Sequence, residues 1–98
     1  MKLRWSRRAL TRLEEIHACI AQDNPAAALR TTQQIVHRVG QIVRFPNSGR
    51  RVPDYPRDDV RELIEGNYRI IYRLGADRVE VLTVKHCAQR LPAELRKL

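Results

Sequence analysis

The heptapeptide Tyr68–Leu74, YRIIYRL, carries the clearest strand pattern in this chain. Its β-branched and aromatic residues are typical of a strand. Tight-turn sequences flank it, Glu65-Gly66-Asn67 before and Gly75-Ala76-Asp77 after. Residues 60–64 and 79–84 are further strand candidates, and turns this short join antiparallel neighbours. The second half of the chain therefore predicts a three-stranded antiparallel meander.

Side chains alternate between the two faces of a strand, so the middle strand has an apolar face and a basic face. The side chains of the apolar face should meet the core: Tyr68, Ile70, Tyr72 and Leu74. The second set should lie on an open face of the sheet: Arg69, Ile71 and Arg73. The preceding strand places on that face either Val60, Glu62 and Ile64 or Arg61, Leu63 and Glu65.

The last strand ends in Lys85-His86, near the start of the middle strand. In a regular hairpin, Arg69 and His86 then share one edge of a groove on the open face. An arginine fork there matches a phosphate or a carboxylate.

The first half of the chain has helical periodicity. Residues 2–5 alternate as a short strand, and Ser6 is a plausible N-cap for an amphipathic helix over 7–22. Asn24-Pro25 ends that helix and starts a second one, which runs to about residue 43. The short link between the two makes them a helical hairpin.

The expected element order is β-α-α-β-β-β. It defines an α+β fold with a helical hairpin on one face of a small, mostly antiparallel, twisted sheet. We expect residues 1–98 to form a single domain, with 91–98 as a short helix or a mobile tail. Residues 46–58 form a long loop, and a functional role and a plain surface crossover are equally good interpretations of it.

The charge balance points to an acidic partner. The chain has 98 residues, with 19 Lys and Arg against 11 Asp and Glu, which gives a formal net charge of +8. A folded domain this basic typically meets nucleic acid, the ribosome or an acidic protein. No signal-peptide run and no membrane-length apolar segment is seen, so we expect a cytoplasmic protein with no membrane partner.

Metal and cofactor chemistry has little support in the sequence. Cys19 and Cys87 form no C-x-x-C pair, and with the three histidines they show no zinc spacing. No glycine-rich phosphate loop is present. We expect neither a cofactor nor a metal, and Cys87 beside His86 is most simply an inert thiol.

Several segments together resemble the RelE/ParE superfamily of bacterial toxins, on its ParE side. The helix start at 24–28, the loop at 45–50 and the strand at 66–73 are typical of that branch, and the whole stretch 60–86 fits it. The resemblance covers about residues 2–90. It implies a toxin of a type II toxin–antitoxin system, silenced by a cognate antitoxin whose C-terminal segment wraps it. The basic face of the sheet predicts that this segment is acidic.

The resemblance leaves two targets open. ParE-like members poison DNA gyrase, whereas RelE-like members cut mRNA in the ribosomal A site. RNA cleavage needs an acid–base set and a stabiliser for the phosphorane. The resemblance offers Arg69 and His86 as the catalytic residues, but Val60 and Glu62 stand where a catalytic lineage has lysines, and Glu62 is interpreted as a surface residue.

The incomplete catalytic set favours the gyrase interpretation. A His-bearing end to the last strand is common in ParE-like chains, and Arg90 stands where they often carry an arginine. The expected target-binding residues are Arg61, Arg69, Arg73, Lys85, His86 and Arg90.

Overall fold

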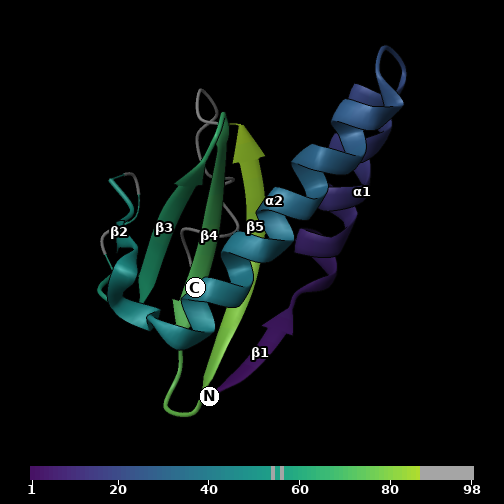
Figure 1. Ribbon diagram of the computed structural model, residues 1–98. Helices are drawn as coiled ribbons and strands as arrows, with labels where there is room; N and C mark the ends of the chain where they lie inside the picture. Colours follow the sequence, from purple (N-terminus) through teal and green to yellow (C-terminus); the bar gives the residue numbers. More distant parts are fainter. Residues whose placement is uncertain (54, 56, 87–98) are drawn as a thin grey trace.

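The computed structural model describes residues 1–53, 55 and 57–86 as two helices on one face of a five-stranded sheet (Figure 1). The elements are β1 (Lys2–Trp5), α1 (Arg7–Ala21), α2 (Pro25–Arg44), the 3-10 turn η1 (Pro46–Ser48), β2 (Arg50–Arg51), β3 (Val60–Glu65), β4 (Tyr68–Leu74) and β5 (Arg78–His86). The predicted α+β class and the order of the main elements are confirmed. The C-terminal helix or tail predicted at 91–98 lies outside the described residues.

The sheet order is β1-β5-β4-β3-β2. The predicted meander is confirmed, because β3 pairs antiparallel with β4, and β4 with β5. Two features were not predicted. β1 lies parallel to β5 at one edge, and β2, inside the predicted loop, pairs antiparallel with β3 at the other edge.

The helix starts follow their capping residues. The Ser6 hydroxyl accepts a hydrogen bond from the Ala9 N–H at 3.0 Å and donates one to the Leu82 carbonyl at 2.8 Å. This second bond joins the start of α1 to β5. The Asn24 side chain accepts from the Ala27 N–H at 3.0 Å, and Pro25 occupies the first turn of α2, as predicted.

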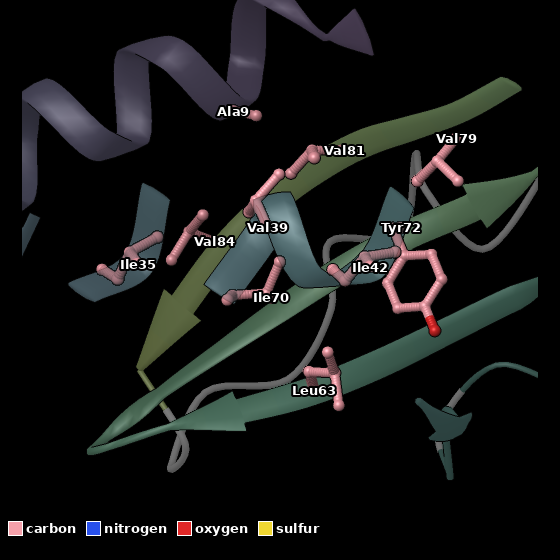
Figure 2. Close-up of a cluster of buried hydrophobic side chains, with 10 residues drawn as sticks. All are labelled: Ala9, Ile35, Val39, Ile42, Leu63, Ile70, Tyr72, Val79, Val81 and Val84. Atoms are coloured by element: carbon pink, nitrogen blue, oxygen red, sulfur yellow. The ribbon is translucent and has the colours of Figure 1, made fainter. Parts of the chain in front are cut away.

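The main core lies between the helices and the sheet (Figure 2). The helices supply Ala9 from α1 and Ile35, Val39 and Ile42 from α2. The strands supply the facing side chains Leu63, Ile70, Tyr72, Val79, Val81 and Val84. Tyr68 and Leu74 pack against this core, so the predicted apolar face of β4 does meet the helices.

The opposite face of the sheet, called the outer face below, carries a second buried cluster. It consists of Val52, Tyr55, Val60, Ile71 and Leu82. Val52 and Tyr55 come from the segment between β2 and β3, so part of the long loop covers this face. The open face expected from the sequence is therefore only partly open.

No helix within the described residues has the length and the apolar composition needed to cross a membrane.

Candidate functional site

A β-bulge in β5 decides which side chains share the outer face. Tyr72 pairs with Val81, but Ile71 pairs with Thr83, so Leu82 is an extra residue in β5. Each inserted residue moves the following side chains to the opposite face. The structure bears this out, because Val84 is in the helix-side core while Leu82 is in the outer cluster.

The bulge separates the two residues that the sequence placed in one groove. Arg69 pairs with Lys85, and Tyr68 pairs with His86. Arg69 and Lys85 therefore lie on the outer face, whereas His86 lies on the helix side, where its ring meets that of Tyr68 edge-on at 5.8 Å. The expectation that Arg69 and His86 share one groove was wrong, since it assumed a regular hairpin.

Glu62 is a buried anion between two arginines. Its two carboxylate oxygens accept hydrogen bonds from Arg69 Nε at 2.7 Å and from Arg50 Nε at 2.8 Å. Glu62 is 1% exposed and Arg69 7% exposed. The interpretation of Glu62 as a surface residue was therefore wrong. The alternation of β3 places Val60, Glu62 and Ile64 on the outer face, the first of the two predicted alternatives.

Lys85 adds a further positive charge beside this group, opposite Arg69 in the register, and is 7% exposed. The sequence did not single out Arg50, which lies in the unpredicted strand β2. The composition of the loop does not indicate this contact. Only the pairing of β2 with β3 identifies Arg50 as a partner of Glu62.

Arg73 lies on the outer face at the other end of β4. It donates to Glu80 of β5 at 3.0 Å, and Glu80 also lies 3.5 Å from Arg4 of β1. These residues help line a hollow of about 380 Å³ at the β4–β5 turn. The guanidinium of Arg57, hydrogen-bonded to Asp59 nearby, holds the pKa of that carboxyl below its ordinary value. Arg73 keeps 38% of its side chain exposed, so it is accessible to a partner.

Arg61 projects to the helix side and donates to the Gly49 carbonyl at 3.1 Å. Beside it, the Tyr72 hydroxyl donates to the Pro46 carbonyl at 2.7 Å and accepts from the Gly49 N–H at 2.9 Å. Burial raises the pKa of Tyr72 above its ordinary value. Arg61 and Tyr72 thus fasten the η1 segment to the sheet.

Two of the residues discussed from the sequence, Cys87 and Arg90, lie outside the described residues. Within the described part of the chain, no group of three or more His, Cys, Asp or Glu side chains could hold a metal ion.

Comparison with known proteins identifies the family of this chain. The family model described as the ParE toxin of the type II toxin–antitoxin system parDE matches residues 3–91. This chain belongs to the ParE toxin family. It is 42% identical over 96 residues to the proposed toxin Y4kP of Sinorhizobium fredii (strain NBRC 101917 / NGR234), covering 96% of each chain.

A solved structure gives the same answer for the fold. The ParE-family chain described here matches one chain of the chromosomal ParDE toxin–antitoxin system from P. aeruginosa with a TM-score of 0.73 and 25% identity. The match covers 88% of this chain and 95% of that chain. The protein is thus a toxin component of a type II toxin–antitoxin system, and the resemblance predicted from the sequence is confirmed.

Proposed function

We propose that this ParE-family toxin inhibits DNA gyrase in the cytoplasm and is neutralised by a cognate antitoxin. The observation that carries the choice of target is the separation of Arg69 and His86 onto opposite faces of the sheet. One phosphodiester cannot take a phosphate stabiliser and a general acid from opposite faces of a sheet. An inhibitory binding domain needs no such pair.

The proposed target-binding residues divide by exposure. Arg73 and His86 are accessible and contact the target directly. Arg90 lies outside the described residues and is proposed as a further contact from its place in the sequence alone. Arg69 and Lys85 are buried and act through the field of the outer face. Arg61 holds the η1 segment in place on the helix side.

The proposed antitoxin supplies an acidic C-terminal segment. The toxin's net charge of +8 favours such a partner and speeds its association. The helices also expose apolar side chains: Leu10, Leu29 and Val36. A hollow of about 390 Å³ next to them, lined by Leu13 and Val36 among others, suits an apolar helix of the same partner.

A cellular experiment tests this proposal. The toxin is expressed alone and together with the product of the open reading frame beside its gene. Gyrase poisoning predicts filamentous cells and a DNA-damage response before protein synthesis stops, and co-expression should restore growth. Immediate arrest of translation without DNA damage would instead favour the ribosome and mRNA as the target.

A further inference from the structure

Basic side chains gather at the edge of the sheet that β1 forms. β5 and β4 follow β1 in the sheet, and Arg4 lies opposite Glu80, which in turn lies opposite Arg73 (Figure 1). The neighbours of Glu80 in β5 point into the helix-side core, so this row lies on the outer face. Lys2 and Arg78 pair two residues away and lie on the same face. These four cations, Lys2, Arg4, Arg73 and Arg78, are called the edge patch below.

The edge patch is accessible to a large partner. The side chains of Arg4 and Arg78 are 64% and 53% exposed. With Arg73 they line the hollow of about 380 Å³ at the β4–β5 turn. The turn itself is closed by a hydrogen bond from the Gly75 N–H to the Arg78 carbonyl at 2.8 Å, so the turn holds Arg78 beside β1.

Two of the carboxylates beside the edge patch are already engaged. Glu80 accepts a hydrogen bond from Arg73 at 3.0 Å and lies 3.5 Å from Arg4. Asp59 accepts two hydrogen bonds from Arg57. The third carboxylate of the hollow belongs to the β4–β5 turn. With Arg57, the edge patch sets five cations against these three carboxylates, so the region keeps a positive charge that attracts an anionic partner.

The arginines of the edge patch suit phosphate groups. Arg4 approaches Glu80 through Nε and Arg73 donates to it through one terminal nitrogen, so each guanidinium has further N–H donors for a phosphate oxygen. Neighbouring strands lie about 4.8 Å apart, so the row from β1 to β4 spans about 10 Å. Double-stranded DNA carries one phosphate per about 1.7 Å of its axis and therefore presents several phosphates over that length.

We propose that the edge patch binds the phosphate backbone of double-stranded DNA. This inference rests on the proposed action on gyrase, whose substrate is duplex DNA, and it assigns part of the toxin's contact to the DNA instead of the enzyme. Contacts to phosphates carry no sequence information, so the binding is independent of sequence and weakens as the salt concentration rises.

An acidic protein segment is a poorer occupant of the edge patch. In an extended segment, the side chains on one face lie about 7 Å apart, so about two carboxylates meet the row from β1 to β4. The phosphates of duplex DNA are more closely spaced and can engage all four cations at the same time.

The test measures binding of the purified toxin to a DNA duplex of arbitrary sequence without gyrase. The logarithm of the association constant should fall with the logarithm of the salt concentration with a slope of about −3 to −4, since each of four cations contributes about −0.9. Arg4→Gln combined with Arg78→Gln should make this slope shallower by about two and weaken binding by about tenfold at about 50 mM salt.

The matched control removes the same charge from the helices. Arg12→Gln combined with Arg30→Gln changes one arginine of α1 and one of α2, which cover the other face of the sheet, and should keep the salt slope of wild type. An NMR titration of wild type adds a measurement that needs no variant. The duplex should shift the amide signals of Gly75–Arg78 more than those of the α1–α2 link at 22–24.

Each outcome has one meaning. Duplex binding with these properties but without an effect on supercoiling by gyrase supports the DNA site and overturns the proposed target. Inhibition of supercoiling by a toxin that does not bind the duplex overturns the DNA site and leaves gyrase as the target. Equal salt slopes for wild type and the Arg4→Gln, Arg78→Gln variant also overturn it. If polyglutamate shifts the Gly75–Arg78 amides and the duplex does not, the edge patch binds an acidic protein and the proposal is wrong.

Discussion

The buried carboxylate of Glu62 accepts a hydrogen bond from Arg69 at 2.7 Å across β3 and β4. The same carboxylate also binds Arg50, whose side chain is 65% exposed. One anion therefore joins a buried and a solvated cation. Glu62→Gln keeps the shape but removes the negative charge that pairs with the buried guanidinium, so the unfolding free energy measured in urea should fall by about 3 kcal/mol.

Arg50, the solvated partner of Glu62, provides the control variant for Glu62→Gln. Arg50→Gln leaves the buried Glu62–Arg69 pair intact and removes a cation whose own side chain is largely solvated, so the loss of unfolding free energy should be smaller, about 1 kcal/mol. If urea titrations gave Glu62→Gln and Arg50→Gln the same loss of unfolding free energy, Glu62 would not be a buried anion held mainly by Arg69.

Gly49 has no room for a side chain. A Cβ at this position would lie 2.4 Å from the Tyr72 hydroxyl and 2.7 Å from the Glu62 carbonyl oxygen. Gly49→Ala should therefore destabilise the protein by about 1–3 kcal/mol. Gly40→Ala, in α2 with nothing within 4 Å of the added Cβ, should instead stabilise it by about 0.5–1 kcal/mol. Thermal melts of both variants check the opposite signs.

The contribution of the Tyr72 hydroxyl to stability should change at alkaline pH. Tyr72→Phe leaves the Gly49 N–H and the Pro46 carbonyl without this partner, which should cost about 1–3 kcal/mol at neutral pH. The pKa of Tyr72 is raised in the folded protein, mainly by burial, so the phenol ionises first in the unfolded chain. Its contribution is complete below the unfolded pKa, near pH 10, and is lost as the pH rises through the folded pKa.

The difference in unfolding free energy between wild type and Tyr72→Phe should therefore decrease above about pH 10 in denaturant titrations. Tyr55 and Tyr68 are common to both proteins and cancel in the comparison. A gap that is constant from neutral to alkaline pH would mean that the folded and unfolded states hold the Tyr72 proton equally.

Periodicity predicted the helices, their caps and the meander because these depend on residues near one another in sequence. It failed at the end of β5, where Val81-Leu82-Thr83-Val84 offers no clear alternation to fix the phase. The bulge at Leu82 is set by packing on both faces of the sheet. That one extra residue decides on which face His86 lies.

The burial of Glu62 was also beyond local reasoning. Its partner Arg69 is seven residues away across a hairpin, and Arg50 is in a two-residue strand that the loop composition conceals. A charged residue inside a strand pattern is usually solvated. Only the tertiary pairing of β2, β3 and β4 shows that Glu62 is buried.

The two accessible target-binding candidates, Arg73 and His86, lie on opposite faces of the sheet, so variants test the contribution of each face separately. Arg73→Ala and His86→Ala should each relieve growth inhibition at equal expression, because each removes an accessible contact. Arg12→Ala on α1 is the control, since Arg12 pairs with Glu15 of the same helix and is not one of the proposed target-binding residues. Full toxicity in both Arg73→Ala and His86→Ala would remove these residues from the target-binding surface.

Gyrase is the proposed target of this toxin, and a reaction with purified components can show whether the toxin inhibits it. The toxin is added to DNA gyrase with relaxed plasmid and ATP, and in parallel to ribosomes programmed with mRNA. We predict loss of supercoiling and accumulation of cleaved DNA, with the mRNA intact. Cleavage of the ribosome-bound mRNA with supercoiling unaffected would exclude gyrase as the target of this toxin.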